Sequence, residues 1–171
     1  PRDEVYVPAV AQQMVQFPGL CMTPNDLICN GDRLALRFTQ HGASTRHDGA
    51  TGAWAGVGLY HWNGNKLTSN WALEDYYARR RQLKEGRCNN LEAPHVAPWD
   101  IPIETADKDA EQAALAWLNS GSMHGSAGVD FDDEWDGHAC GPLIEVGETT
   151  VDDIFSAGNA VAFHVSQRGS Y

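Results

Sequence analysis

The sequence predicts an α+β fold in which helices pack on an antiparallel sheet, and three patterns support this prediction. Apolar residues recur at three- and four-residue spacing over 3–17, which is typical of an amphipathic helix. Residues 33–39 alternate between apolar and polar side chains, as a strand with one buried face does. Residues 54–62 and 67–75 are two further strand-like segments, and the Asn-Gly dipeptide at 63–64 predicts a hairpin turn between them.

The segments that follow or join these elements have recognisable compositions. The first helix is expected to end at a Pro-Gly pair, and residues 42–53 form a polar, glycine-rich connection. Residues 76–84 predict a short basic tail with helical character. Residues 85–104 contain three prolines and no periodicity, which indicates a linker. A second helix is predicted over 106–119, with Thr105 as its N-cap.

Composition and charge narrow the classes of function. Acidic residues outnumber basic ones by 23 to 12, and residues 91–171 hold fifteen Asp and Glu but only two Lys and Arg. This charge repels phosphate backbones, so nucleic acid is not an expected partner. No stretch approaches the about 18 apolar residues of a transmembrane helix and no signal peptide is evident, so no membrane association is expected. The four cysteines contain no CxxC pair, which predicts free thiols and a cytoplasmic protein.

Two segments of the chain are similar at a constant offset of 127 residues. Residues 23–44 and 150–171 share six identities in 22 positions without a gap. We interpret this as duplication, with the later part of one unit in 1–84, a linker in 85–104 and the opening part of a second unit in 105–171. One alternative is that two unrelated segments share a sequence pattern because both form the same kind of hairpin. A permuted arrangement, within one chain or between two, is another.

The order of helix, glycine-bounded strand, glycine-rich connection and hairpin resembles that of a known protein family. The stretch 58–83 resembles the last hairpin of the SnoaL-like polyketide cyclase, or ester cyclase, group of the nuclear-transport-factor-2-like (NTF2-like) superfamily. The residues that match the pattern are Gly64, Lys66, Trp71, Asp75, Gln82 and Leu83. The resemblance implies an NTF2-like cone, in which a curved antiparallel sheet packs on helices around a pocket, with a partial second copy. It also implies a homodimer or a tandem pseudo-dimer.

His61 and Asp75 are the predicted catalytic residues. They flank the hairpin turn, so their relative orientation depends on the loop length. A three-residue loop pairs His61 with Leu67 and places both candidates on one strand face, whereas a two-residue loop separates them. The apolar parity favours the first arrangement, in which both side chains point into a hydrophobic interior that raises a carboxyl pKa. The alternative is that Asp75 caps the following segment and His61 lies at the rim.

The predicted substrate pocket consists of apolar residues assigned to this face and one residue of the preceding strand. These residues are Val57, Leu59, Leu67, Trp71, Leu73 and Phe38. Glu74 has the opposite parity and is expected to point outward. An acidic run over 130–138 indicates a solvated loop rather than a calcium site, because Leu143 stands where the bidentate Glu belongs. The histidines lack metal-binding spacing, so no metal is expected.

The resemblance leads to the functional prediction. In the cyclases that this sequence resembles, an Asp and a His of this hairpin carry out aldol-type ring closure without metal or cofactor. It therefore implies a cofactor-independent acid-base enzyme, with Asp75 as base, His61 as its assistant and a small hydrophobic carbonyl compound of polyketide type as substrate. A non-catalytic module for small-molecule binding or dimerisation is the alternative. An isomerase, dehydratase or epoxide hydrolase on the same fold is a third possibility.

Overall fold

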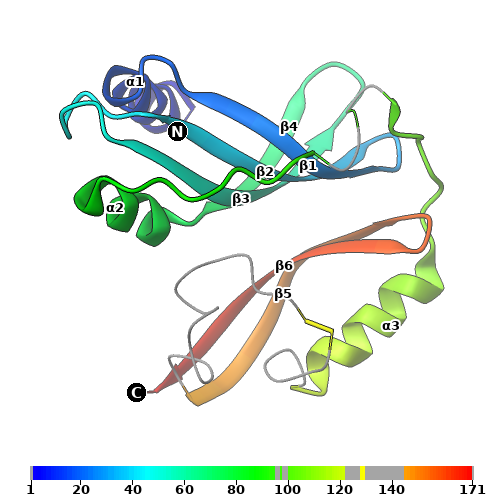
Figure 1. The fold of residues 1–171 in the computed structure, drawn as a ribbon. Coiled ribbons are helices and arrows are strands. Elements are labelled where there is room, and N and C mark those ends of the chain that lie inside the picture. The colour runs from blue at the N-terminus through cyan, green and yellow to red at the C-terminus, as the bar shows by residue number, and fades with distance from the viewer. Residues whose placement is uncertain (1, 95–96, 98–99, 122–127, 130–144, 171) are drawn as a thin grey trace.

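The computed structural model describes residues 2–94, 97, 100–121, 128–129 and 145–170 (Figure 1). The elements, in chain order, are the π-helical segment η1 (Arg2–Tyr6), α1 (Val7–Gln16), β1 (Cys21–Cys29), β2 (Arg33–Ala43), β3 (Thr51–Trp62), β4 (Leu67–Glu74), α2 (Tyr76–Glu85), α3 (Lys108–Asn119), β5 (Glu145–Ala157) and β6 (Ala160–Ser170).

Strands β1 to β4 form one curved antiparallel sheet in chain order, and β5 and β6 form a separate hairpin. The fold is therefore α+β, and each predicted helix and strand is present within a few residues of its expected bounds. The periodicity does not show β1. Pro24 interrupts this strand, and a bulge between Pro24 and Asp26 accommodates the proline at the edge of the sheet, where its missing N–H costs little.

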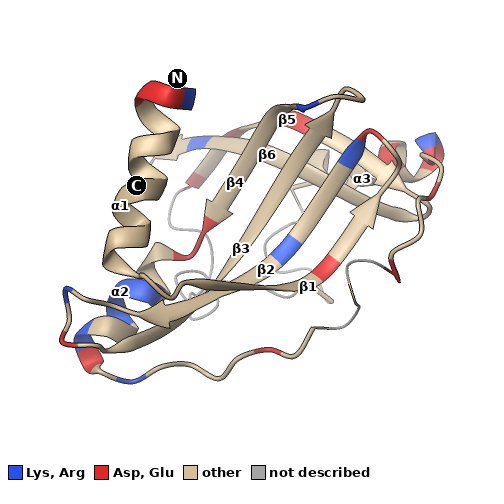
Figure 2. Ribbon diagram, turned by 90° about the horizontal axis from the view of Figure 1, so that it is seen from above, with Lys and Arg blue, Asp and Glu red and all other residues tan. Residues whose placement is uncertain are grey.

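Helices α1 and α2 gather at one end of the sheet, and the described helices leave the other end of that face uncovered (Figure 2). Phe17, which follows α1, is fully buried and packs with Trp54 of β3 and with Ala78 and Leu83 of α2. The ring centroids of Phe17 and Trp54 lie 5.3 Å apart. Because aromatic rings bury large apolar areas, this cluster holds both helices on the sheet.

Capping residues define both ends of α2. Asp75 is its N-cap, and the Asp75 Oδ1 atom accepts a hydrogen bond from the backbone N–H of Ala78 at 2.8 Å. Gly86 ends the helix in the left-handed conformation, at a φ angle of 67°, which glycine adopts without steric cost. The chain therefore turns sharply at each end of this ten-residue helix.

Gln82 of α2 completes the edge of β3 where β4 has already ended. Its side chain is fully buried. The Gln82 Oε1 atom accepts a hydrogen bond from the Ala53 N–H at 2.9 Å, and Nε2 donates to the Ala53 carbonyl at 2.5 Å. Oε1 also accepts from the backbone N–H of Asn89 at 2.8 Å. The amide thus takes the place of a neighbouring strand and satisfies backbone groups that are shielded from water.

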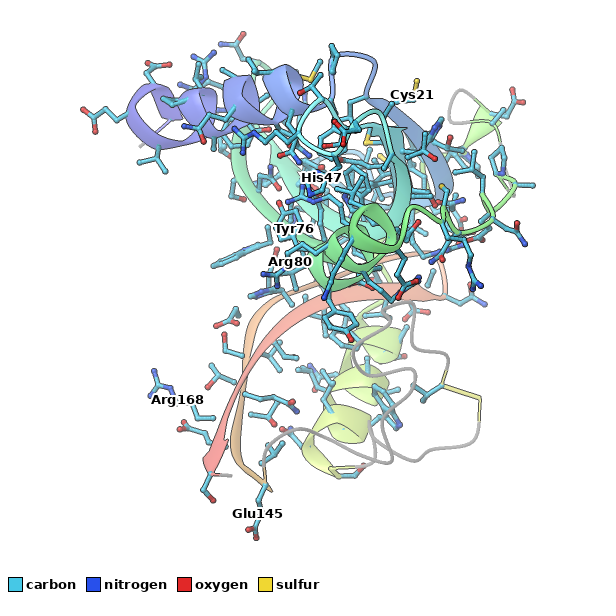
Figure 3. All side chains as sticks on the ribbon, turned by 60° about the vertical axis from the view of Figure 1, so that its left-hand side comes forward. Cys21, His47, Tyr76, Arg80, Glu145 and Arg168 are labelled. Carbon is cyan, nitrogen blue, oxygen red and sulfur yellow. The ribbon has the colours of Figure 1, made fainter. Side chains whose placement is uncertain are left out.

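The β5–β6 hairpin crosses the opposite face of the four-stranded sheet (Figure 1). Phe155 of β5 packs there against Ala35 of β2 and Leu59 of β3, and all three side chains are buried. Figure 3 shows the far ends of the two strands, marked by Glu145 and Arg168, projecting away from the sheet. The hairpin therefore contacts the sheet mainly through the part of β5 and β6 next to their turn.

The hairpins β1–β2 and β5–β6 have the same register at the offset of 127 residues. All eight residue pairs recorded between β1 and β2 recur between β5 and β6. A bulge precedes Asp26 in β1 and its counterpart Asp153 in β5. The hydrophobic cluster between the hairpins contains two pairs of residues that correspond at the offset of 127. These pairs are Ile28 with Phe155, and Ala35 with Ala162. The sequence similarity therefore corresponds to a similarity in strand pairing.

A buried polar cluster fixes α3 on β5. Asp107, rather than the predicted Thr105, is the N-cap of α3. Its backbone N–H donates to the hydroxyl of the fully buried Ser156 at 2.7 Å. The Ser156 hydroxyl in turn donates to Glu111 Oε1 at 2.8 Å, and the Lys108 ammonium lies 2.7 Å from Glu111 Oε2. The hydrogen bond from Lys108 and those from Ser156 lower the pKa of Glu111, against the opposing effect of its burial.

We expect Glu111 to make the stability of the chain depend on pH in the acid range. Because its folded-state pKa lies below the ordinary value of 4.5, its contribution is complete above that value and is lost as the pH falls through the folded-state pKa. Urea unfolding of the wild type and of Glu111→Gln, followed from pH 7 to pH 3, measures it. The difference in unfolding free energy should shrink below about pH 4.5, and a constant difference would contradict the prediction.

No helix among the described residues is both long enough and apolar enough to cross a membrane. Cys21, Cys29 and Cys88 are free thiols, as the sequence predicts. The fourth cysteine, Cys140, and the acidic run over 130–138 lie outside the described residues.

Candidate functional site

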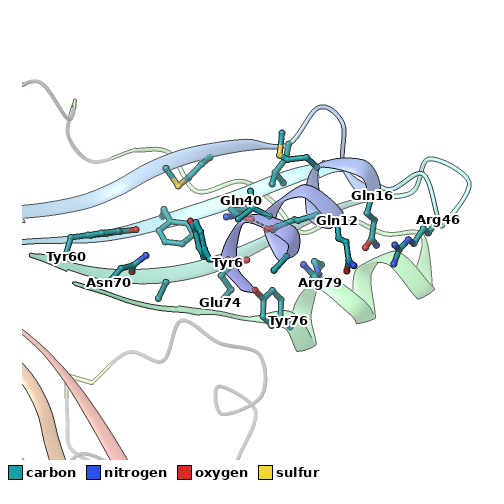
Figure 4. A pocket seen from close by; sticks show the side chains of 18 residues that line it. Tyr6, Gln12, Gln16, Gln40, Arg46, Tyr60, Asn70, Glu74, Tyr76 and Arg79 are labelled. Carbon is teal, nitrogen blue, oxygen red and sulfur yellow. Dashed lines mark hydrogen bonds between the residues drawn. The ribbon is translucent and has the colours of Figure 1, made fainter. Parts of the chain in front are cut away.

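The sheet face under α1 contains two adjoining hollows. The first, here called the helix-covered cavity, has a volume of about 600 Å³ and lies between α1 and the four-stranded sheet. The second, here called the apolar groove, has a volume of about 480 Å³ and is lined by residues of β1 to β4 and of the β1–β2 turn. Tyr60 lines both hollows. The polar side chains of the helix-covered cavity, drawn in Figure 4, are Tyr6, Gln12, Gln13, Gln16, Gln40, Arg46, Tyr60, Asn70, Glu74, Tyr76 and Arg79.

Glycines of β3 make the helix-covered cavity possible. Gly56 and Gly58 lie on the same strand face as Tyr60. A methyl group on Gly58 would lie 2.5 Å from the Tyr60 hydroxyl oxygen, and one on Gly56 would clash with the Phe38 ring. The two rings therefore lie flat over bare backbone. This packing places the Tyr60 hydroxyl over Gly58. Gly56, the next residue of β3 on the same face, pairs with Glu74 of β4.

Glu74 is the carboxylate of the helix-covered cavity, and it lies near the middle in Figure 4. It is the last residue of β4. The indole N–H of Trp54 donates to Glu74 Oε2 at 2.8 Å. Trp54 is only 1% exposed, so its N–H needs a partner inside the protein, and this requirement fixes the position of the carboxylate.

Two phenols of the cavity lie within reach of the charge of Glu74. Burial raises the pKa of Tyr60, and the charges of Tyr6 and Glu74 raise it further. Burial also raises the pKa of Tyr76, as do the charge of Glu74 and a hydrogen bond with it, against the opposing charge of Arg79. Both phenols therefore stay protonated at neutral pH and can donate hydrogen bonds. The Tyr60 hydroxyl has no hydrogen-bond partner among the described residues, which leaves it available to a ligand.

Arg79 of α2 provides positive charge. Its guanidinium carbon lies 4.3 Å from the centroid of the Tyr76 ring and 5.3 Å from that of Trp54. Burial lowers the pKa of Arg79, although a guanidinium remains charged at every physiological pH. Within the part of the chain that the structure describes, Arg79 forms no salt bridge. The charge of Glu74 acts on Arg79 and raises its pKa, but the two side chains form no salt bridge. A half-buried cation that is held by aromatic rings and forms no salt bridge is suited to binding an anion.

Amide side chains form much of the remaining wall. Gln13 of α1 donates from Nε2 to Gln40 Oε1 of β2 at 2.9 Å. Gln16 of α1 donates from Nε2 to the Ser44 hydroxyl at 3.2 Å. Since each amide both donates and accepts, these residues can bind carbonyl and hydroxyl groups of a ligand. The cavity is therefore more polar than the hydrophobic interior that the sequence predicts.

The structure places His61 and Asp75 far apart. His61 pairs with Ser69, and Trp62 pairs with Leu67 across a four-residue loop, so the register differs from the predicted three-residue loop. Asp75 lies six residues beyond Ser69, which corresponds to about 20 Å along an extended strand. His61 is exposed near the turn, with Nδ1 3.2 Å from the Thr68 hydroxyl, and Asp75 caps α2. The two side chains do not form a hydrogen-bonded pair.

The predicted pocket residues divide between the two sheet faces. Phe38 lines the helix-covered cavity and Leu67 lines the apolar groove. The other four, which are Val57, Leu59, Trp71 and Leu73, have the parity of the opposite face. Leu59 packs against the β5–β6 hairpin, and Trp71 stacks on His164 of β6 with ring centroids 4.4 Å apart. Their apolar character therefore reflects the hairpin contact on that face, where Val57 and Leu73 remain exposed.

The cavity residues that the sequence analysis did not assign to the predicted pocket are Glu74, Tyr60, Tyr76 and Arg79. Trp54, which holds Glu74 in place, was not assigned to it either. A signal for them exists in the order Trp54, Gly56, Gly58 and Tyr60, in which large rings and glycines share one strand face. If Gly56 and Gly58 are taken as positions that make room for aromatic rings, and not as polar positions, the face of β3 that carries Trp54 and Tyr60 is the one predicted to be buried. Among the described residues, no group of three or more His, Cys, Asp and Glu side chains is placed to hold a metal ion.

Three solved structures are similar to part of this chain. AclR, a candidate hydroxylase from Streptomyces galilaeus, is 18% identical with a TM-score of 0.43, over 47% of this chain and 65% of AclR. A candidate polyketide cyclase from Acidithiobacillus ferrooxidans is 23% identical with a TM-score of 0.41, over 47% of this chain and 61% of that protein. TsrD from Streptomyces laurentii is 20% identical with a TM-score of 0.41, over 44% of this chain and 61% of TsrD. Each match thus covers less than two thirds of the other protein. No family model and no curated protein matches the chain.

Proposed function

We propose that the helix-covered cavity binds a small oxygenated carbonyl compound and catalyses proton transfer at the carbon next to its carbonyl group. The observation that carries this proposal is that one carboxylate, Glu74, and two protonated phenols, Tyr60 and Tyr76, line the same cavity of about 600 Å³. This volume falls in the usual range for small-molecule sites. Glu74 thereby takes the role that the sequence analysis gave to Asp75.

The chemistry of the proposed step balances within the cavity. The Glu74 carboxylate removes the α-proton, and the electron pair of the C–H bond moves to form an enolate. The neutral Tyr60 phenol donates a hydrogen bond to the enolate oxygen, where negative charge develops. In an aldol-type closure the enolate carbon attacks a second carbonyl of the same molecule. The protonated Glu74 then returns its proton to the new alkoxide.

Two other groups support Glu74 without exchanging the substrate proton. The Trp54 indole holds one carboxylate oxygen at 2.8 Å, and Tyr76 hydrogen-bonds to the same side chain. Both contacts fix the direction of the carboxylate before a substrate binds, which reduces the reorganisation that the reaction requires. Trp54 and Tyr76 are therefore positioning residues in this proposal.

The experiment that tests the proposal measures exchange of the α-protons of 2-tetralone, an aromatic ketone, in D₂O by ¹H NMR. We expect the wild-type chain to accelerate exchange with saturation. In a second sample in H₂O, the ketone should shift the Trp54 indole N–H signal, assigned with Trp54→Phe. A shift without accelerated exchange would refute the catalytic proposal and identify a binding module. Neither a shift nor exchange, with a panel of aromatic and aliphatic ketones, would refute both.

We also propose that residues 105–171 are the opening part of a second unit, joined through 85–104 to the unit in 1–84. The common register and bulge of the two hairpins support this, as does the contact that contains both members of equivalent residue pairs. The β5–β6 hairpin then occupies the sheet face where a second copy would pack, which makes the chain a tandem pseudo-dimer. Sedimentation at micromolar concentration should show a monomer, and a stable homodimer would contradict this arrangement.

A further inference from the structure

The helix-covered cavity and the apolar groove adjoin on one sheet face, and together they are here called the trough. Both lie on the sheet face under α1, and Tyr60 contributes to the wall of each. Leu34 and Leu36 of β2 line the groove and have the same strand parity as Phe38, which lines the cavity. Trp62 has the same parity as Tyr60 along β3. A molecule that lies along the strands can therefore occupy both hollows at once.

The groove end of the trough is apolar and open. Leu67 is 57% exposed and Trp62 is 41% exposed, and both line the groove with Leu34 and Leu36. The described helices cover only the other end of this face (Figure 2). Exposed apolar side chains that gather in a hollow, rather than singly, mark a binding surface.

The other end of the trough is cationic. Figure 4 shows Tyr60 at one end of the helix-covered cavity, Glu74 near the middle, and Arg79 and Arg46 toward the far end. Arg79 has no salt bridge among the described residues, although the chain carries an excess of acidic residues and a net charge of −11. The trough therefore presents a cation, a carboxylate base and an apolar surface in that order along its length.

The geometry points to an elongated amphipathic oxo acid as the ligand, with its carboxylate at Arg79, its oxo group between Glu74 and Tyr60, and its hydrocarbon tail in the apolar groove. This inference rests on the proposed function for the role of the oxo group, but the carboxylate and the tail are recognised by residues outside the catalytic pair. The order of the three recognition elements favours a long anionic ligand over a short or uncharged ketone, which would occupy only the middle of the trough.

Equilibrium binding of two homologous probe series tests the inference. The probes are unbranched saturated carboxylic acids of 6 to 16 carbons and their methyl esters, titrated by NMR against the labelled chain. For the wild type, affinity should rise by about two- to fourfold per methylene, since each buried methylene adds apolar transfer free energy. The acids should bind about tenfold or more tightly than their esters, because of the charge-assisted contact with Arg79.

Matched variants separate the two ends of the trough. Arg79→Gln should remove the preference for acids over esters, and Arg79→Lys should retain part of it. Arg80→Gln, which removes the neighbouring exposed charge of α2, should leave the preference unchanged. Leu67→Ser should weaken binding of the long probes more than of the short ones. Leu73→Ser changes an equally exposed leucine of β4 on the other sheet face and should have no such effect.

The outcomes distinguish this inference from the proposed function. Affinity that does not depend on chain length, or an acid-to-ester ratio that Arg79→Gln leaves unchanged in a folded variant, would overturn the inference. If the probes bind as expected but the wild type exchanges no α-protons, the catalytic proposal fails and the ligand assignment stands.

Discussion

Replacing Glu74 by Gln should lower the rate of α-proton exchange by about two to four orders of magnitude, the range typical for loss of a general base. The amide keeps the shape of the side chain and can still accept the hydrogen bond from Trp54, so the cavity should keep its form. What it loses is the ability to take a proton. The measurement is the ¹H NMR exchange of 2-tetralone α-protons, with thermal unfolding of both proteins as a check on folding.

Asp75→Asn is the matched control for this prediction. Asp75 is the next residue in the chain and also carries a carboxylate, but it caps α2 and does not line the helix-covered cavity. Asparagine is an equally good N-cap, so the variant should fold and retain exchange within about twofold of the wild type. If instead Asp75→Asn removes exchange and Glu74→Gln retains it, then Asp75 is the base and our assignment of Glu74 fails.

Replacing Gln82 by Leu should destabilise the chain by about 3–5 kcal/mol. The leucine can fill most of the volume, but it leaves the N–H and C=O of Ala53 and the N–H of Asn89 without the partners they have now. Each buried backbone group left unsatisfied costs about 1–3 kcal/mol. Part of this cost is relieved where the edge of β3 opens to water, so the three costs should not add in full.

Urea unfolding of Gln82→Leu measures this effect, with Gln112→Leu as the control. Gln112 is an exposed glutamine in α3, and its replacement should change the unfolding free energy by no more than about 0.5 kcal/mol. A loss below about 1 kcal/mol for Gln82→Leu would show that the amide does not replace a strand at this edge. The buried position of Gln82 would then be a matter of packing alone.

The sequence by itself determined the local structure. The three- and four-residue spacing in the first helix, the alternation of β2 and the turn residues at 63–64 each depend on contacts within a few residues, so they remain visible without tertiary information. The similarity at an offset of 127 residues likewise anticipated a common strand pairing, because the register of a hairpin follows from its own residues. The exception is β1, in which Pro24 hides the strand pattern.

Only the tertiary structure decided which face of the sheet forms the site. Both faces of β3 meet packed elements, since α1 lies over one and the β5–β6 hairpin over the other, and alternation along a strand cannot tell two covered faces apart. The glycines at 56 and 58 hid the inner face, because the rings that fill their space come from Phe38 and Tyr60. His61 and Asp75 are apart in either register, because Asp75 follows the end of β4 and lies six residues beyond Ser69, the partner of His61.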